Sequence, residues 1–230
     1  MNRQNPYQAE YDVFCSMIEG KKLPIGPTLK LIAKIPLGLI EFLIRYIPGP
    51  IGFKLRYYYY KLFLKKMGKN VMIDVGVFLN GPANISLADF VWIDCNCIIS
   101  AHLGEISIGR RVHIAPFSIL GAREPIIIED YVGISASVKI YSNSEHPADG
   151  KRMSGPMIPE SMKAFKSAPV TLRKDSFVGT NSVILPGVEL GEGAVVAPNT
   201  VISKSVQPYD IVAMAGRKIG TRAPVDVPDI

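Results

Sequence analysis

Large aliphatic residues recur at every sixth position along most of the chain. The series consists of Ile73, Leu79, Leu87, Ile93, Ile99, Ile108, Ile114, Leu120, Ile128, Ile134 and Ile140, and then of Leu172, Val178, Ile184, Leu190, Val196 and Ile202. The fifth position of a hexad is usually small, as at Val112, Ser118, Val132, Val138, Ser182, Ala194 and Thr200. A period of six is neither the period of a helix, about 3.6, nor a simple alternation. It fits short strands joined by tight turns, with one large and one small side chain inward on each side of a coil, so we predict a β-solenoid.

Longer intervals interrupt the series, and the hexads between them come in threes. The interval is eight residues from Leu79 to Leu87, nine from Ile99 to Ile108, eight from Leu120 to Ile128 and thirty-two from Ile140 to Leu172. Three hexads make one turn of a three-sided prism, so the extra residues are expected to leave the prism at one common corner. The largest of these insertions contains His146.

The positive charge of the chain is confined to its first part. Residues 1–69 contain 12 lysines and arginines against 4 acidic residues, a net charge of +8, whereas residues 70–230 contain 14 against 16, a net charge of −2. The two values add up to the +6 of the whole chain. Such an asymmetry indicates two parts of different character.

The basic first part is also strongly apolar. Over residues 28–46 the charged side chains form one narrow stripe at helical spacing, made of Lys30, Lys34, Glu41 and Arg45. No stretch reaches the roughly eighteen uncharged apolar residues of a membrane span. A basic, aromatic, proline-kinked helix suits the surface of an anionic membrane, which favours each nearby cation by ~1 kcal/mol. Packing on the solenoid or on another subunit is the alternative, and no nucleic acid is expected as a partner because no readout motif accompanies the charge.

Cysteine usage indicates a reducing compartment. Cys15, Cys95 and Cys97 are too few and too irregularly placed for a disulfide framework or a zinc site. Cys97 occupies the small inward position of its hexad, so we expect it in the core. No secretory signal opens the chain. We therefore expect a cytoplasmic protein, held peripherally on the inner face of the cytoplasmic membrane.

Three stretches of the chain resemble known families. The stretch "SFVGTNSVILPGVELGEGAVVAPNTVISKSVQPYDIVA" is similar to the last coils of hexapeptide-repeat acyltransferases, which are left-handed parallel β-helices. The stretch "YSNSEHPADGKRMSG" resembles the acceptor loop of their galactoside, maltose and xenobiotic acetyltransferase branch. The string "IPGPIGFKLRYYYYKLFLKKMGKNVMI" resembles the leading segment of acetyltransferases that modify bacterial surface polysaccharides. The resemblance to the hexapeptide-repeat family covers residues 70–219 and implies a mainly β chain with a helical appendage.

The charge asymmetry and the extent of the repeat divide the chain into three parts. We expect a basic helical segment over residues 1–69, a left-handed β-helix over residues 70–206 with an acceptor loop at 141–171, and an extension over residues 207–230. The loop at 141–171 is called the long loop below.

Acyl transfer to a sugar hydroxyl needs a base for the proton, and the resemblance assigns this role to His146. An imidazole can take and return a proton near neutral pH, whereas the alternative is a solvated loop histidine. Asp149 and Arg152 follow it in the loop and are expected to bind substrate. Asn96 matches an asparagine that holds the acceptor across a subunit boundary, but asparagine is also common at turns.

A further set of residues matches positions that line the coenzyme A groove of the family. The set comprises Phe177, Gly179, Thr180, Pro198, Ser203 and Lys204, with Arg217 and Lys218 as candidates for the phosphates. Gly179 is expected to let the pantetheine arm approach the backbone. Two departures from the family pattern are Phe177, where many relatives have tryptophan, and "MAGRKIG", where they usually read Gly-Asn-Pro-Ala-Lys-Val-Ile.

A metal site is not expected. One branch of the fold binds zinc through three histidines. Here His102 and His113 occupy different positions of their hexads and His146 lies outside the repeat, so the three do not share a face.

These features together predict an O-acetyltransferase. It is expected to move acetyl from acetyl-CoA to a sugar hydroxyl of a bacterial surface polysaccharide, such as lipopolysaccharide, or of its lipid-linked precursor. The resemblance implies a homotrimer and a ternary complex with His146 as base. The alternatives are an N-acetyltransferase acting on a nucleotide-linked amino sugar and a trimeric scaffold without activity.

Overall fold

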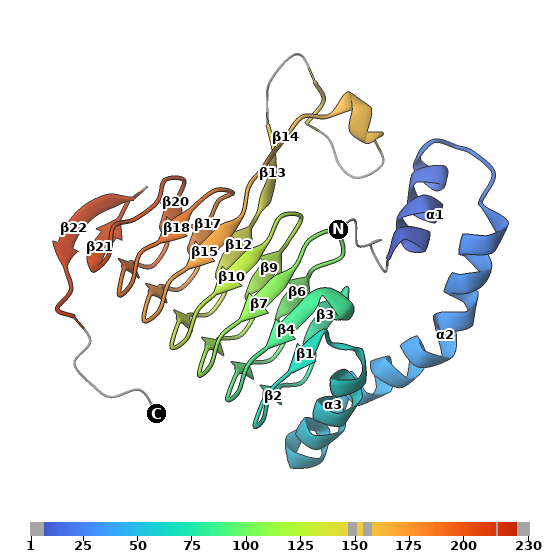
Figure 1. The fold of residues 1–230 in the computed structure, drawn as a ribbon, viewed down its shortest axis with the longest axis horizontal. Helices are drawn as coiled ribbons and strands as arrows, with labels where there is room; N and C mark the ends of the chain where they lie inside the picture. The colour runs from blue at the N-terminus through green and yellow to red at the C-terminus, as the bar shows by residue number, and fades with distance from the viewer. Residues whose placement is uncertain (1–6, 147–150, 154–157, 215, 225–230) are drawn as a thin grey trace.

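The chain folds as a left-handed parallel β-helix with three helices at its N-terminal end (Figure 1). The computed structural model describes residues 7–146, 151–153, 158–214 and 216–224. The helices are α1 (Gln8–Ile18), α2 (Ile25–Tyr46) and α3 (Gly49–Phe63). They precede the first coil, and the solenoid then runs without a change of direction to its last strands.

Three sheets form the sides of the prism. Sheet A contains β1 (Lys66–Met67), β4 (Ile85–Leu87), β7 (Ile106–Ile108), β10 (Ile126–Ile128), β15 (Val170–Leu172) and β18 (Glu189–Leu190). Sheet B contains β2 (Met72–Ile73), β5 (Trp92–Ile93), β8 (His113–Ile114), β11 (Gly133–Ile134), β16 (Phe177–Val178), β19 (Val195–Val196), β21 (Asp210–Ala213) and the antiparallel β22 (Arg217–Thr221). Sheet C contains β3 (Phe78–Asn80), β6 (Ile98–Ser100), β9 (Ile119–Gly121), β12 (Lys139–Tyr141), β17 (Val183–Ile184) and β20 (Val201–Ile202).

The hexad pattern is the core of this prism. All seventeen aliphatic residues of the series are buried, as are the seven small residues at the fifth position. Two of the buried hydroxyls among the small residues find backbone acceptors in the next coil: Ser118 Oγ donates to the Ser135 carbonyl at 3.1 Å, and Ser182 Oγ donates to the Ala197 carbonyl at 3.0 Å. Each coil therefore covers the apolar side chains and the polar atoms of its neighbour.

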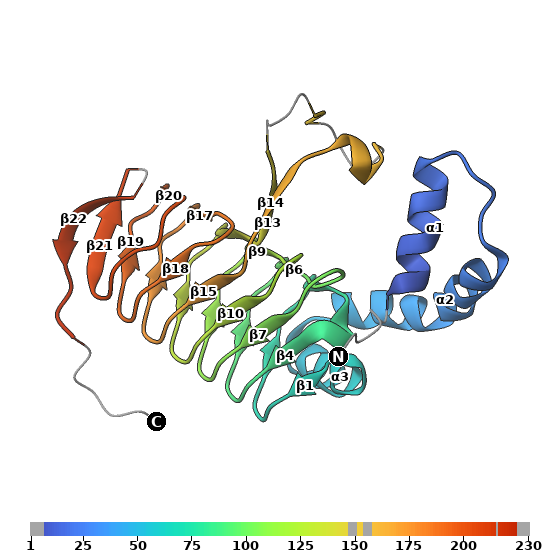
Figure 2. The same ribbon diagram turned by 45° about the horizontal axis from the view of Figure 1, so that its top comes forward.

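The insertions share one corner, as predicted. The chain passes from β3 to β4, from β6 to β7, from β9 to β10 and from β12 to β15 at the edge where sheet C turns into sheet A. The last of these passages is the long loop, which contains the hairpin of β13 (Asn143–Glu145) and β14 (Phe165–Ser167) and projects away from the prism (Figure 2). A two-bond ion pair from Arg123 to Glu160, at 2.8 and 2.9 Å, ties the loop back to the corner.

A buried arginine joins the helices to the first coil. Arg56 of α3 is completely covered, and its guanidinium donates to the carbonyls of Ile44 and Ile47 at the end of α2 and to the Ile73 carbonyl of β2. The last carbonyls of a helix have no partner within the helix, so the guanidinium supplies donors that they otherwise lack. Arg56 thus fixes the junction of α2 and α3 on the end of the solenoid.

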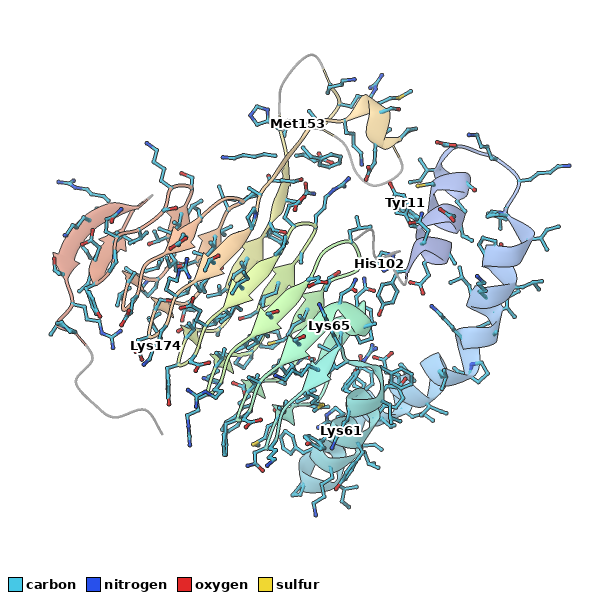
Figure 3. The ribbon with its side chains drawn as sticks, viewed as in Figure 1. Tyr11, Lys61, Lys65, His102, Met153 and Lys174 are labelled. Carbon is cyan, nitrogen blue, oxygen red and sulfur yellow. The ribbon has the colours of Figure 1, made fainter. Side chains whose placement is uncertain are left out.

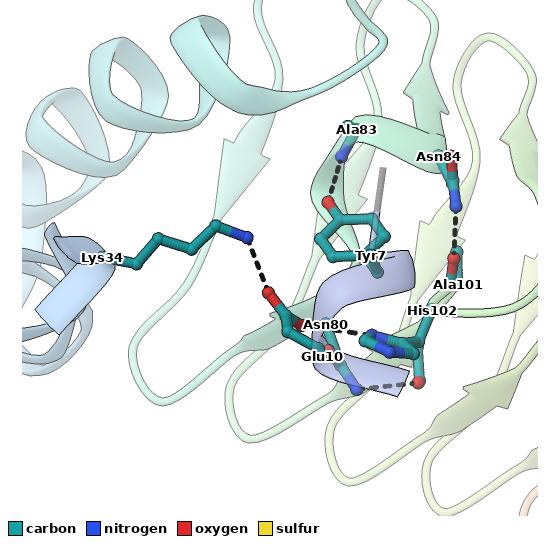
Figure 4. Close-up of polar contacts among 9 residues, drawn as sticks. Tyr7, Glu10, Lys34, Asn80, Ala83, Asn84, Ala101 and His102 are labelled. Atoms are coloured by element: carbon teal, nitrogen blue, oxygen red, sulfur yellow. Dashed lines mark hydrogen bonds and ion pairs between the residues drawn. The ribbon is translucent and has the colours of Figure 1, made fainter. Parts of the chain in front are cut away.

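Polar contacts hold α1 and α2 together and against the corner (Figure 4). The Tyr7 hydroxyl accepts a hydrogen bond from the Ala83 amide at 2.8 Å, and Lys34 of α2 donates to Glu10 of α1 at 2.7 Å. Further along α2, Glu41 accepts from the hydroxyl of Tyr60 at 2.9 Å and pairs with Arg45. Three members of the predicted charged stripe therefore face the protein, which leaves the aliphatic side of α2 outward.

Candidate functional site

The long loop places His146 at the end of a short hairpin. Its backbone amide donates to the Ala164 carbonyl at 2.9 Å, which continues the ladder of β13 and β14, and its side chain is exposed. Side chains alternate along such a ladder, so Ser144 and His146 lie on the opposite side from Asn143 and Phe165. Arg152 is exposed and bonded through its backbone to Met162. Asp149 lies outside the described residues.

A cavity of about 860 Å³ opens between α1, the corner of sheets C and A, and the long loop. Tyr11 of α1 and His102 of the corner, both labelled in Figure 3, line it together with Asn143 and Phe165. His146 is not among its lining residues. The volume lies within the range of pockets that hold small molecules, roughly 300–1,000 Å³. The sequence did not predict this cavity, because α1 lies far from the corner in sequence.

The cavity wall carries paired charges. Hydrogen bonds from Arg123 lower the pKa of Glu160 below its usual value. Burial raises the pKa of Tyr11 to about 12, with further contributions from Cys15 and Glu160. Tyr11 therefore stays a neutral hydroxyl near neutral pH, able both to donate and to accept a hydrogen bond. The wall thus offers polar groups suited to hydroxyls or to a polar headgroup.

Asn96 occupies a turn. Its φ of 57° is in the left-handed region, at the corner where sheet B turns into sheet C. In the preceding coil Gly76 stands at the same corner, and a Cβ there would lie 2.1 Å from Oδ1 of Asn96. Asparagine tolerates the left-handed region better than most residues, which accounts for Asn96 without a substrate. Its binding of acceptor stays a prediction.

The eight predicted coenzyme residues fall in four places. Phe177 lies on the outer face of sheet B, Gly179, Thr180 and Pro198 lie where sheets B and C meet, Ser203 and Lys204 follow β20, and Arg217 and Lys218 lie on β22. The structure thus brings the first four to adjoining coils and leaves the others at the next corner and at the end of sheet B. The Lys218 side chain is paired with Asp210.

The packing between coils accounts for a glycine at position 179. A Cβ at this position would stand 2.6 Å from the Pro198 nitrogen and 2.7 Å from the Val196 carbonyl oxygen. Both are backbone atoms of the next coil and cannot move aside cheaply. The close approach that glycine permits here is therefore between coils, and an approach of pantetheine to this residue stays a prediction.

Sheet B also carries a contact that the sequence did not predict. Nε2 of His113 lies 2.8 Å from Oδ2 of Asp94 in the preceding coil. The two side chains are diagonal neighbours on the outer face, because Trp92 is the residue directly beside His113. Counting positions on either side of the inward Ile93 and Ile114 would have placed the carboxylate and the imidazole together.

The structure also describes the surroundings of Cys97 and the side chains that could bind a metal ion. Cys97 is buried, as predicted, and donates to the Ala115 carbonyl at 3.2 Å. Burial raises the pKa of its thiol to about 12, which makes it a poor nucleophile near neutral pH. Among the described residues, histidine, cysteine and acidic side chains form no group of three or more that could hold a metal ion.

Known proteins are similar to this chain in sequence and in fold. Residues 169–204 match the family described as bacterial transferase hexapeptide (six repeats). The chain is 33% identical over 160 residues to dTDP-4-amino-4,6-dideoxy-D-glucose acyltransferase of Escherichia coli, which covers 69% of this chain and 83% of the relative. A match of 34% over 67 residues, 29% of this chain and 34% of the relative, links it to the putative lipopolysaccharide biosynthesis O-acetyl transferase WbbJ of Escherichia coli K12.

A solved structure agrees with these relatives. The N-acyltransferase AntD from Bacillus cereus, in complex with dTDP and 3-hydroxybutyryl-CoA, superimposes with a TM-score of 0.68 at 31% identity, over 73% of this chain and 88% of AntD. The repeat, the left-handed prism and the identity over most of a full-length relative lead to one conclusion. The chain belongs to the hexapeptide-repeat acyltransferases.

Proposed function

We propose that the chain transfers acetyl from acetyl-CoA to the amino group of a nucleotide-linked sugar. The observation that carries this proposal is the similarity over most of the chain to an acyltransferase and an N-acyltransferase whose names specify a dTDP-linked amino sugar or dTDP.

O-acetylation of a sugar hydroxyl, which the sequence predicted, is the second candidate. The stretch similar to WbbJ favours it, and so does the basic, apolar helical segment, because a polysaccharide acceptor carried on lipid would be met at a membrane. The two candidates share the donor and the thioester chemistry, and they differ in the acceptor atom.

One assay separates these candidates. The protein is incubated with acetyl-CoA and with free, nucleotide-linked and lipid-linked sugars, and release of the free thiol is followed. Alkaline treatment of the product then distinguishes an ester, which is cleaved, from an amide, which survives. Absence of turnover with every acceptor would favour the scaffold without activity.

The family resemblance also implies roles for individual residues, and each role is tested separately from the proposed transfer. It implies His146 as a general base, with Asn96, Asp149 and Arg152 near the acceptor. Phe177, Gly179, Thr180 and Pro198 would line the pantetheine arm, and four further residues, Ser203, Lys204, Arg217 and Lys218, would contact the rest of the coenzyme. The division into residues 1–69, 70–206 and 207–230 is also kept as a proposal.

A homotrimer is proposed from the outer faces of the prism. Sheet A presents mostly polar outward side chains, such as Ser86, Ser107 and Thr171. Sheets B and C present exposed apolar ones, namely Phe78, Trp92, Ile98, Phe177 and Val201. Apolar faces of this size favour burial against other copies of the chain, and three-fold symmetry closes such contacts. Light scattering during turnover tests this, and an active monomer would contradict it.

Peripheral binding to an anionic membrane is proposed for α2, on a cytoplasmic protein. Every residue of this helix is at least partly exposed, and its outward side chains are mainly leucine, isoleucine and phenylalanine. Within the described residues no helix has the length and apolarity needed to cross a bilayer. A helix that lies in the interface needs only one apolar side, so α2 suits the surface of a membrane.

A further inference from the structure

His113 and Asp94 form an oriented pair on the outer face of sheet B. The 2.8 Å contact joins Nε2 to Oδ2, the imidazole is 52% exposed, and the carboxylate is 18% exposed. The ring of Trp92 stands 5.7 Å from the imidazole, measured between centroids. The carboxylate is mostly buried, and its contact with the half-exposed imidazole fixes the orientation of the ring.

The contact also decides which nitrogen is free to react. A carboxylate only accepts hydrogen bonds, so the neutral ring that best satisfies Asp94 has its proton on Nε2. Nδ1 then keeps its lone pair. Such an imidazole can take a proton through Nδ1 while Asp94 stabilises the cation that results.

The outer face of sheet B leads from this pair to the predicted coenzyme residues. The residue beside His113 in the next coil is Gly133, and the one beside Gly133 is Phe177. Two steps between strands span roughly 10 Å. Gly133 has no side chain, and the Phe177 ring covers it, since a Cβ there would lie 2.8 Å from Cδ2 of that ring.

The neighbouring row of outward positions on the same face also has small side chains beside the pair. Ala115 and Ser135 follow the inward Ile114 and Ile134, as Asp94 follows Ile93, and therefore point outward beside the pair. Gly179 ends this row one coil further on. Small side chains thus lie between the imidazole and the predicted pantetheine position, where the thioester and an acceptor would have to meet.

We propose that His113 is the general base of the acyl transfer and that Asp94 is its positioning residue. This rests on the proposed function. The acceptor amine or hydroxyl attacks the thioester carbonyl, forming a new bond from nitrogen or oxygen to carbon, while its proton passes to Nδ1 of His113. The tetrahedral intermediate then collapses, the carbon–sulfur bond breaks, and the imidazolium returns the proton to the departing thiolate of coenzyme A.

This assignment moves the proton transfer away from His146. His146 stands on a projecting hairpin, and its described contact is a backbone hydrogen bond. His113 is built into the prism and shares a face with Phe177 and Gly179. A residue on the rigid solenoid keeps its position relative to a coenzyme on the same sheet, which is what base catalysis requires.

The test measures turnover of acetyl-CoA with the best acceptor in His113→Gly, His146→Ala and a matched control, Ser107→Gly. Ser107 lies in the coil of His113 but on sheet A. We expect His113→Gly to lower kcat by about 10²–10⁴-fold, the usual value of a positioned base, with the oligomeric mass and the Kd for coenzyme A unchanged. Added imidazole should restore part of the lost kcat, which a merely structural defect would not allow. The loss in His146→Ala should be smaller.

Asp94→Asn tests the positioning role. It should lower kcat with KM nearly constant, and it should add little to the loss in His113→Gly, because the two residues act as a unit. Normal turnover in His113→Gly, failure of imidazole to restore any activity, or a larger loss in His146→Ala would each overturn the assignment while the proposed function stands. A wild-type protein that acylates no acceptor would overturn both.

Discussion

The leucines of the solenoid and the leucines of α2 have the same side chain and opposite surroundings. Leu120 is 0% exposed inside the prism, whereas Leu39 is 60% exposed on the helix. The solenoid buries its own aliphatic residues because each coil is covered by the next. In α2 the charged stripe contacts the neighbouring helices: Lys34 donates to Glu10 of α1, and Glu41 accepts from Tyr60 of α3. The aliphatic side is consequently left for a surface that is not part of this chain.

The comparison shows that an apolar pattern alone does not say where the apolar side points. In a coil the inward direction is fixed by closure of the prism. In a helix beside the prism it depends on which side finds partners, and for α2 the side with partners is the charged one. The two regions should therefore respond in opposite ways to the same substitutions.

The largest difference is expected for loss of a leucine side chain. Leu120→Ala leaves a hole in a closed core and should lower the free energy of unfolding by about 2–5 kcal/mol. Leu39→Ala removes an exposed side chain from a good helix position and should change it by less than about 0.5 kcal/mol. Urea denaturation of the two variants beside the wild type measures both values. Similar losses would mean that the aliphatic side of α2 packs on the protein in solution.

A second difference concerns vesicles. Replacement of Leu39 and Leu43 by glutamine should weaken binding to anionic vesicles by about tenfold or more, because each leucine that enters the interface contributes about 1.5–3 kcal/mol when fully buried. Ile127→Gln, which changes an outward residue of sheet A, is the control and should bind like the wild type. Added salt should weaken binding without abolishing it, since screening affects only the charges. Wild-type protein that fails to sediment with anionic vesicles at low ionic strength would rule out the membrane role.

Replacement of glycine by alanine should change the stability of the two regions in opposite directions. Gly179→Ala forces a Cβ within 2.7 Å of two backbone atoms and should destabilise the solenoid by about 1–3 kcal/mol. Gly38→Ala fills open space within α2 and should stabilise the chain by up to about 1 kcal/mol through helix propensity. Thermal unfolding of both variants measures the two shifts. A stable Gly179→Ala protein that no longer binds coenzyme A would instead support the role that the sequence assigned to this glycine.

The sequence predicted the prism well for a physical reason. Each coil contacts only its neighbours, so a count from Ile73 to Ile202 contains nearly all the information needed to place the core and the common corner of the insertions. The cavity could not be counted in this way. It depends on the hydrogen bond between Tyr7, at the start of α1, and Ala83. These two residues are 76 positions apart in sequence, and the repeat does not predict that they meet.

The candidate site was predicted less completely for the same reason. Motifs identify residues that stand in a known order, such as His146 in the long loop, but they say little about outward neighbours. The pair of His113 and Asp94 depends on the register between two coils, and the orientation of α2 depends on the partners that Lys34 and Glu41 find. Such partners are contributed by other elements, so one stretch of sequence does not contain them.

The smallest expected effect concerns pH and the joint between the two regions. His102 lies at the corner beneath α1, its ring 5.0 Å from that of Tyr7, with Glu10 and Lys34 as the charged groups that face it. Burial lowers its pKa below the ordinary value of 6.5; Glu10 opposes this shift and Lys34 adds to it. The unfolded chain therefore binds more protons than the folded one just below pH 6.5, and the stability gained by burying the neutral ring is lost as the pH falls.

We expect the thermal midpoint to drop slightly between neutral pH and about pH 5.5, with faster hydrogen exchange in α1 than in the coils. His102→Gln should remove this part of the pH dependence, whereas His146→Gln, an exposed loop position, should leave it in place. An unchanged pH dependence in His102→Gln would show that the joint between α1 and the solenoid does not respond to this imidazole.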